Sequence, residues 1–450
     1  MFSYRRLLLS VFVLLSGTFL AVSSLRAQPG AEIYGSDVYW NATPNDINNL
    51  LKGMKDSASA DFRMDIRKLN EISADPEKNP VLYRSGHYRF AFTEAERQLL
   101  REYMLAGGMM IFNTGLGSLP FYQSVQRELQ AIFPEQPLQR LSSDHPVFHS
   151  FYSMDQVEYT PAVRAAGYRG NEPWFDAVEI NCRVVALVSR WGMAVGWQGE
   201  VKDEYQAYTE ESAFRLGVNI LTYATSMRAW TQNSALAMQF VNEDTAASDY
   251  FMMGQVVYDG VWKTRHAGIS VLMQAFNQRT GVPVKFGLRD LRLTDDRLFD
   301  TPVLYMTGHE HFELNPEEIA ALRLYLENGG LLLAESCCGR RGFDLAFRQM
   351  IQRVLPGRPL EPLSPDSPLF QLPNDVQWMG VTPVLMQDVG AAGIPPQLLV
   401  VDVDGNQAVV YSPLGLAGGW EMSPSPYARA YNPASAIKLG ENLLMHSITH

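Results

Sequence analysis

Two short stretches in the second half of the chain carry residue types that could do chemistry. One contains His309 and His311, separated by a glutamate, and the other, residues 335–342, contains Cys337 and Cys338. Each stretch directly follows an apolar, strand-like segment. Because the carboxyl ends of parallel strands form one edge of a sheet, we expect the side chains of the two stretches to meet there.

The first interpretation of these residues is a cysteine nucleophile. Cys337 stands on a predicted strand-to-helix turn, and a helix start or nearby cations lower the pKa of a thiol. Arg340 and Arg341 follow it closely, and His309 or His311 could serve as its base. The sequence leaves a plainer interpretation open, in which both cysteines of this stretch are small residues packed in the core.

The second interpretation is a metal site. Imidazole nitrogen and thiolate sulfur are ligands that zinc prefers, so zinc is the candidate cofactor. Residues two apart in an extended segment point to the same side, so both histidine rings could face one ion. No Cys-x-x-Cys spacing accompanies them. The candidate ligands are His309, His311, Cys337, Cys338 and Glu335.

The third interpretation is the binding of a small anionic or carbohydrate ligand. Gly339, Arg340, Arg341 and Gly342 directly precede a predicted helix, and His311 belongs to the neighbouring stretch. Backbone N–H groups at a helix start and guanidinium groups both hold phosphate or carboxylate groups. The alternative is a surface turn with two solvated arginines.

Alternating strands and helices must position these stretches. Residues 302–307 and 331–334 are predicted to be buried strands, and between them Asn315 caps a helix that the glycine pair 329–330 ends. Such alternation predicts a mostly parallel sheet with helices on both faces. A hairpin signal at residues 402–406 adds antiparallel strands at one edge.

The chain also repeats itself. Residues 80–148 align without a gap with residues 302–370, so that His87 corresponds to His309, 222 residues later (309 − 87). The first copy has a capping box at Thr93, and residues 37–40 are its first predicted strand. It has Gly115 where the second copy has Cys337, so the second copy is the better candidate for activity. We therefore predict two tandem α/β domains, at residues 31–230 and 234–450.

The N-terminus predicts export from a bacterial cytoplasm. Arg5 and Arg6 precede an apolar run over residues 7–22, and cleavage after Ala27 would remove residues 1–27 as a signal peptide. The predicted location is therefore the periplasm or the cell exterior. The alternative is an uncleaved N-terminal membrane anchor, although the run is short for a span of about 20 residues.

Composition excludes some classes of function. The chain of 450 residues has 37 basic and 48 acidic residues and a net charge of −11, so it lacks the basic balance typical of nucleic-acid binding. It has 3 cysteines, Cys182 besides the neighbouring pair, which is too few for a disulfide framework.

The second copy resembles a known family. The strings Tyr-Met-Thr-Gly-His at residues 305–309, Leu-Arg-x-Tyr-Leu-x-x-Gly-Gly at 322–330 and Ser-Cys-Cys-Gly at 336–339 are similar to the bacterial domain-of-unknown-function family 4159. The first copy, without the cysteine pair, resembles it more weakly. The resemblance implies a fold similar to class I glutamine amidotransferases, a flavodoxin-like three-layer sandwich. It implies no particular activity.

Within that resemblance, Cys337 with Gly339 two residues later is similar to the nucleophile turn of the amidotransferases. Glu335 stands where those enzymes have a glycine, and their His-x-Glu pair near the end of the domain is absent. The sequence therefore favours a non-catalytic module of the cell envelope that binds an envelope protein or a small anionic or carbohydrate ligand. The alternative is a cysteine- or metal-dependent hydrolase or amidotransferase-like enzyme that acts through Cys337 and His309.

Overall fold

In the computed structural model the chain divides into two compact units, Met1–Arg228 and Ala229–His450. The structure describes residues 9–13, 43–58, 62–66, 68–76, 78–237, 249–265, 267–281 and 284–449. The boundary falls within helix α6 (Glu210–Ala237), a few residues before the join that the sequence predicts. The strand predicted at residues 37–40 and the cleavage site predicted at Ala27 lie outside the described residues.

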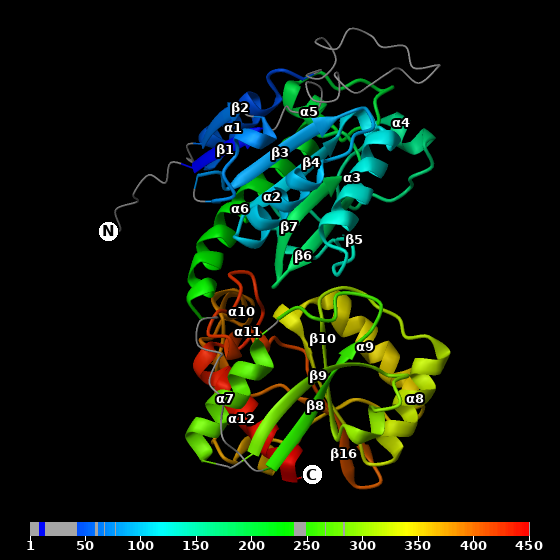
Figure 1. The fold of residues 1–450 in the computed structure, drawn as a ribbon, viewed down its shortest axis with the longest axis vertical. Coiled ribbons are helices and arrows are strands. Elements are labelled where there is room, and N and C mark those ends of the chain that lie inside the picture. The colour runs from blue at the N-terminus through cyan, green and yellow to red at the C-terminus, as the bar shows by residue number, and fades with distance from the viewer. Residues whose placement is uncertain are drawn as a thin grey trace, which may run out of the picture. The chain divides into compact units, whose positions relative to one another are not determined.

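The first unit contains a seven-stranded sheet in the order β2-β1-β3-β4-β7-β6-β5 (Figure 1). The five strands from β2 to β7 in this order are parallel, and β6 and β5 continue the sheet in antiparallel pairs. The strands are β1 (Leu9–Val13), β2 (Phe62–Ile66), β3 (Val81–Gly86), β4 (Met109–Thr114), β5 (Gln139–Arg140), β6 (Phe175–Ile180) and β7 (Arg183–Ser189). The helices besides α6 are α1 (Asp46–Ala58), α2 (Glu94–Leu105), α3 (Leu119–Ile132), α4 (Pro161–Ala165) and α5 (Ala194–Gln198).

The second unit has a sheet of the same plan in the order β9-β8-β10-β11-β16-β15-β12. Its strands are β8 (Asp249–Val257), β9 (Val284–Arg292), β10 (Val303–Gly308), β11 (Leu331–Ser336), β12 (Glu361–Pro362), β15 (Leu399–Val403) and β16 (Asn406–Ser412); β13 (Met379–Gly380) and β14 (Gly393–Ile394) form a separate pair. The helices are α7 (Gly268–Thr280), α8 (Pro316–Glu327), α9 (Arg341–Val354), α10 (Pro383–Val389), α11 (Ala417–Trp420) and α12 (Pro433–Thr449). The predicted hairpin is present, since β15 and β16 are antiparallel neighbours.

Strand β1 comes from the stretch that the sequence predicts to be a signal peptide. It pairs in parallel with β2 and β3. In the second unit the corresponding position, between β9 and β10, belongs to β8. Cleavage after Ala27 would remove β1 from the chain, so the signal peptide stays a prediction.

The two units repeat the same local signals. Helices α2 and α8 begin 222 residues apart (316 − 94) and both have twelve residues. Each starts with a capping box. Thr93 Oγ1 accepts the N–H of Glu96, and Glu96 Oε2 accepts the N–H of Thr93 at 2.7 Å. The Asn315 and Glu318 pair does the same in the second unit at 2.9 Å for both bonds. The two predicted helix starts are therefore confirmed.

The repeated glycine pairs have two different physical causes. The first glycine of each pair, Gly107 or Gly329, has a φ of 118° or 89°, which is unfavourable for other residues. The second, Gly108 or Gly330, lies against a tyrosine ring. A Cβ there would come within 2.1 Å of Tyr103 or 2.3 Å of the corresponding tyrosine in the second unit. Both positions of the pair therefore require glycine.

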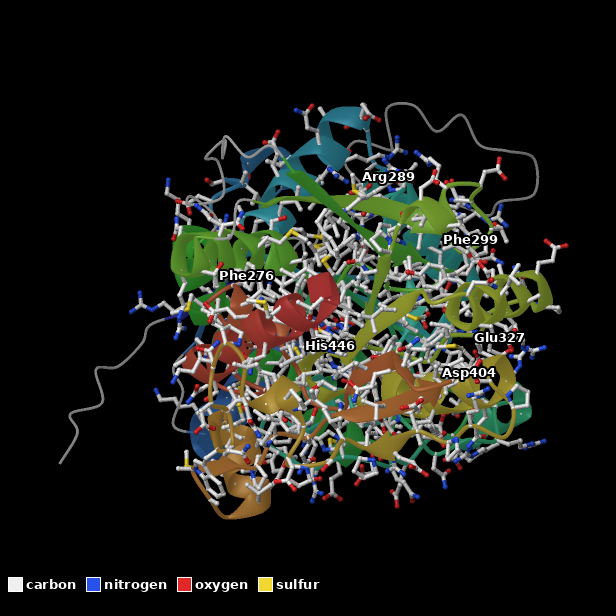
Figure 2. All side chains as sticks on the ribbon, turned by 90° about the horizontal axis from the view of Figure 1, so that it is seen from below. Phe276, Arg289, Phe299, Glu327, Asp404 and His446 are labelled. Atoms are coloured by element: carbon white, nitrogen blue, oxygen red, sulfur yellow. The ribbon has the colours of Figure 1, made fainter. Side chains whose placement is uncertain are left out.

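Each sheet lies between two helical layers. In the second unit α7 and α12 cover one face and α8 and α9 the other (Figure 1). The strand side chains alternate accordingly, because Tyr305 packs with the α7 and α12 cluster and Met306 with the α8 and α9 cluster. Figure 2 shows the side chains that fill these layers, with Phe276 of α7 buried and Glu327 of α8 at the surface. Among the described residues, no helix is long and apolar enough to cross a membrane.

Asp46 at the start of α1 gives a pH-dependent test of this packing. Burial raises the pKa of Asp46 from 3.8 to about 6, against hydrogen bonds from the Ile47 N–H, Thr43 and Tyr83. Since the folded pKa exceeds the unfolded one, the group stabilises the fold most below pH 3.8, and this contribution is lost as the pH rises through about 6.

We expect Asp46→Asn to abolish that loss. Relative to the parent protein, the free energy of unfolding of the variant should rise by about 2.4 kcal/mol between pH 4 and pH 7, since one pKa unit corresponds to about 1.4 kcal/mol and part of the change lies below pH 4. Urea unfolding at both pH values measures this difference. Ser57→Ala, at the exposed end of the same helix, is the control. It should change the free energy of unfolding by the same amount at pH 4 and at pH 7. If the free energies of unfolding of Asp46→Asn and the parent protein differed by the same amount at both pH values, the raised pKa of a buried Asp46 would be contradicted.

Candidate functional site

His309 and Cys337 lie side by side because strands β10 and β11 end together. The two strands are parallel, and their last paired residues are Gly308 and Ser336. The next residue of each strand therefore leaves the sheet at the same edge. This is the edge at which α/β folds bind ligands.

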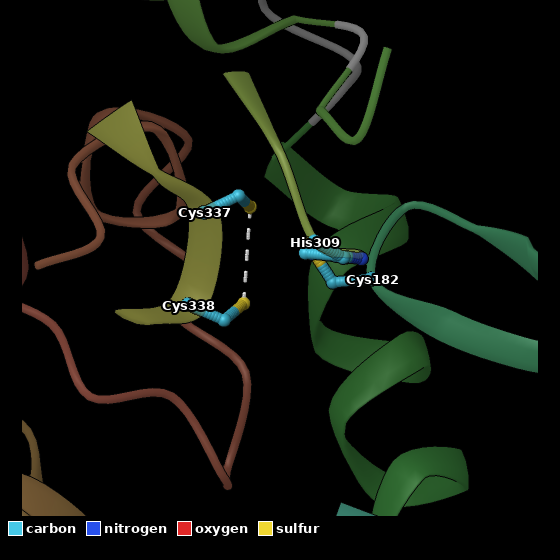
Figure 3. Close-up of side chains that lie close together, drawn as sticks. All are labelled: Cys182, His309, Cys337 and Cys338. Atoms are coloured by element: carbon cyan, nitrogen blue, oxygen red, sulfur yellow. Dashed lines mark hydrogen bonds between the residues drawn. The ribbon is translucent and has the colours of Figure 1, made fainter. Parts of the chain in front are cut away.

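The turn after β11 brings two thiols next to the histidine. Cys338 has a left-handed backbone, with φ 58° and ψ 12°. The Sγ atoms of Cys337 and Cys338 lie 3.9 Å apart, and a ring nitrogen of His309 and both sulfurs lie within 4.8 Å of one another. Figure 3 shows the two sulfurs on the same side of the turn, the side on which His309 lies. Cys182, also drawn there, belongs to the first unit.

These separations suit a tetrahedral metal ion. Two thiolates bound to zinc at about 2.3 Å are about 3.8 Å apart, and a thiolate and an imidazole nitrogen about 3.6 Å apart. The observed Sγ–Sγ distance of 3.9 Å already matches the first value. From a separation within 4.8 Å, the ring of His309 needs to approach by about 1 Å at most. The cluster can therefore hold a metal ion.

Neighbouring loops fix the backbone of this turn. The N–H of Arg429 donates to the carbonyl of Cys338 at 2.9 Å, and the N–H of Phe343 donates to the carbonyl of His309 at 3.1 Å. A Cβ at Gly415 would lie 2.8 Å from the backbone nitrogen of Cys338, so the loop before α11 contacts the turn directly. The ligand atoms are thus held on a constrained backbone, which reduces the cost of assembling a site.

The three ligand residues differ in exposure. Cys337 is 1% exposed and His309 2% exposed, whereas Cys338 is partly exposed. Burial raises the pKa of the Tyr258 and Tyr305 hydroxyls, and the Glu335 carboxylate raises that of Tyr305 further. Both tyrosines therefore remain protonated beside the thiols, and the Tyr258 hydroxyl donates to the carbonyl of Thr307 at 2.9 Å.

Two other predicted ligands lie outside the cluster. The His311 side chain is 60% exposed, with Nε2 3.5 Å from Oε1 of Glu313. Glu335 is fully buried, but its oxygens accept hydrogen bonds from the Tyr305 hydroxyl at 2.8 Å and the Ala417 N–H at 3.0 Å, and from a further backbone N–H. Glu335 therefore has a structural role at the end of β11.

The two arginines of the predicted anion site have different environments. Nη2 of Arg340 is 2.6 Å from Oε1 of Glu310, and both side chains are 7% exposed. Arg341, the first residue of α9, is exposed. Gly339 has a φ of 65°, and a Cβ there would lie 2.5 Å from the carbonyl oxygen of Arg429. The buried ion pair leaves Arg341 as the arginine of this turn that is exposed to solvent.

Single substitutions separate these two arginines. We expect Arg340→Ala to lower the free energy of unfolding by about 3–5 kcal/mol, because it leaves the buried Glu310 carboxylate without its ion pair. Arg341→Ala should change that energy by less than about 0.5 kcal/mol. Urea unfolding of the full chain measures both. If both substitutions lowered the free energy of unfolding by the same amount, the buried ion pair of Arg340 with Glu310 would be contradicted.

The first unit has the same turn without the thiols. Gly115 and Leu116 stand at the positions of Cys337 and Cys338, and Leu116 has a similar left-handed backbone, with φ 48° and ψ 30°. A Cβ at Gly115 would lie 2.5 Å from the ring of His87. The histidine and the first turn residue are therefore neighbours in both units, but the described first unit offers no thiol there.

Two features of the site escaped prediction from sequence. The sequence predicts a nucleophile at Cys337, which is almost fully buried. The residue of the turn that has a left-handed backbone is its neighbour Cys338, and no sequence pattern indicated this. The ion pair of Arg340 with Glu310 joins residues 30 positions apart. Gly339 is the sequence signal that could have indicated this turn, since glycine is common where a turn requires a positive φ.

Comparison with known proteins agrees with the duplicated architecture. The family described as Domain of unknown function (DUF4159) matches residues 31–225 and again residues 252–448. A comparison with curated proteins found no match. The two matched regions cover most of the chain, and they contain the His309 strand end and the Cys337–Gly339 turn in the second copy. The chain belongs to this family and carries two tandem copies of its domain.

Proposed function

We propose that the protein is a binding module of the bacterial cell envelope whose second domain binds a divalent metal ion, zinc, through His309, Cys337 and Cys338. The observation that carries this proposal is the approach of three ligand atoms to within 4.8 Å of one another. Their side chains come from two neighbouring strand ends, so the site is built by the fold rather than by a flexible tail.

The donor set favours zinc on chemical grounds. Thiolate and imidazole ligands suit a borderline-soft divalent ion, and hard ions such as calcium or magnesium prefer oxygen. Two thiolates would balance the charge of a divalent ion, which matters because Cys337 and His309 are buried. Three protein ligands leave a fourth tetrahedral position, which could take water or a ligand on the side of the partly exposed Cys338.

Sheet topology supports this location for a ligand site. Counted along the chain, the parallel strands of each unit lie in the order 2-1-3-4-5. This order supports a flavodoxin-like sandwich, as the resemblance to class I glutamine amidotransferases implies. In that topology the strand order reverses between β8 and β10, and His309 directly follows β10.

Metal titration tests the proposal. Purified full-length protein should bind about one zinc ion per chain, as expected of one tetrahedral site. Cys337→Ser, Cys338→Ser and His309→Ala should each weaken binding by about 100-fold or more, beyond the 10–100-fold typical of residues that only orient ligands. Competition with a chromophoric chelator measures the affinity.

His311→Ala is the matched control for His309→Ala, because His311 lies on the same loop with an exposed side chain. This control should bind zinc like the parent protein. Thermal unfolding without metal shows whether each variant is folded. The proposal is wrong if the parent binds no zinc, or if the folded ligand variants bind it as tightly as the parent does.

A second candidate function is catalysis by a cysteine nucleophile. The left-handed backbone of Cys338 favours it, because strained strand-to-helix turns also present the nucleophiles of several hydrolases. Leu116 has the same conformation in the first unit, so the turn alone does not require catalysis. Iodoacetamide labelling read by mass spectrometry distinguishes the two functions. Zinc should slow the labelling of both cysteines, whereas a nucleophile predicts rapid labelling of Cys338 alone, with or without zinc.

We also propose export, on the basis of the basic and apolar N-terminal sequence. When the full gene is expressed in a bacterium, the mature protein should be periplasmic and should start at Gln28, as the intact mass will show. Deletion of residues 2–27 should retain it in the cytoplasm. A periplasmic chain that keeps residues 9–13 would instead indicate an uncleaved anchor.

A further inference from the structure

The first domain has a polar cavity at the edge of its sheet that corresponds to the thiol site of the second. The cavity has a volume of about 80 Å³ and lies at the carboxyl ends of β3 and β4. Hydroxyl, imidazole, amide and carboxylate groups line it together with a few apolar side chains. The polar lining residues are Thr43, Ser85, His87, Asn113, Glu200 and Tyr205.

Small residues stand beside the cavity at two positions where the second domain has larger ones. Gly115 stands where the second domain has Cys337, and the ring of His87 lies against its Cα. Thr43 stands 222 residues before Arg265 (265 − 43), whose buried side chain pairs with Glu421 at 2.9 Å. The first domain therefore has a smaller side chain than the second at both positions.

Hydrogen bonds fix the floor of the cavity. Nδ2 of Asn113 donates to Oγ of Ser85 at 2.8 Å, and Oδ1 of Asn113 accepts the N–H of Met193 at 2.7 Å. Thr43 at the rim donates its hydroxyl to Asp46 at 2.9 Å. Asn113, Ser85 and Thr43 are thus held in place before any ligand enters, which lowers the entropic cost of binding.

The charge of the lining selects against anions. Burial lowers the pKa of His87, so its imidazole is neutral at neutral pH. Of the lining residues, Glu200 is acidic, and neither lysine nor arginine is among them. A phosphate or carboxylate would therefore meet the like charge of Glu200 and no cationic side chain of the lining. Uncharged hydroxyl groups can exchange hydrogen bonds with every polar group of the lining.

We propose that the first domain binds a small uncharged ligand rich in hydroxyl groups, the terminal unit of a carbohydrate, in this cavity. One bound water needs about 10–15 Å³ of such space, so a cavity of about 80 Å³ has room for several waters or for the hydroxylated end of a sugar. The ring of Tyr205 offers an apolar face against which a sugar can stack. This site does not depend on the metal site of the second domain.

Ligand-observed NMR on the full-length protein tests the proposal. The probes are glucose, N-acetylglucosamine and the short polyol glycerol, with inorganic phosphate and ethanolamine as charged comparators. We expect at least one of the two sugars to bind saturably, more tightly than glycerol, phosphate and ethanolamine. Ser85→Ala and His87→Ala should each weaken that binding about tenfold or more, as expected when a buried hydrogen bond is lost.

Tyr88→Ala is the matched control, because Tyr88 follows His87 directly but is exposed and does not line the cavity. It should bind the sugar like the parent protein. Thermal unfolding shows whether each variant is folded. The proposal is overturned if neither sugar binds saturably, if a charged comparator or glycerol binds more tightly, or if folded Ser85→Ala and His87→Ala bind the sugar unchanged. If the parent protein binds no zinc, the sugar-binding test is unaffected, because the two sites lie in different domains.

Discussion

A buried carboxylate at the end of β11 orients the loops around the thiol site. Glu335 accepts hydrogen bonds from the Tyr305 hydroxyl and from the backbone N–H groups of Leu416 and Ala417. Burial raises the pKa of this carboxyl, and those donors oppose the rise. A buried carboxylate that lost its donors would cost several kcal/mol. Strand β10, strand β11 and the loop before α11 are therefore held together two residues before Cys337.

The first unit meets the same constraint with an amide. Asn113 occupies the position of Glu335, donates to Ser85 on the neighbouring strand and accepts from the N–H of Met193. The connection between strands and loop is thus preserved while the buried charge is removed. Duplication has kept the framework and changed the side chains at the sheet edge. This explains how one fold can present two thiols in one copy and a polar cavity, beside Gly115, in the other.

Sequence predicted the features that depend on near neighbours in the chain. The helix starts at Thr93 and Asn315 are confirmed because each capping box needs only residues within one turn. The alternation of strands and helices follows from burial patterns in the same way. The pairing of Arg340 with Glu310 depends on how α9 follows β11, which no local pattern reveals. The left-handed backbone of Cys338 was also hidden, since cysteine rarely adopts it.

That backbone is the reason two adjacent cysteines can serve one ion. In an extended strand, neighbouring side chains point to opposite faces. The left-handed residue of this turn reverses the relation, so the two sulfurs lie 3.9 Å apart on one side. The conformation costs about 1 kcal/mol or more for a residue with a Cβ, yet Leu116 adopts it in the turn Gly115–Gly117, which contains no cysteine. The cost therefore belongs to the fold, and a pair of cysteines at this turn acquires a bidentate geometry without further backbone strain.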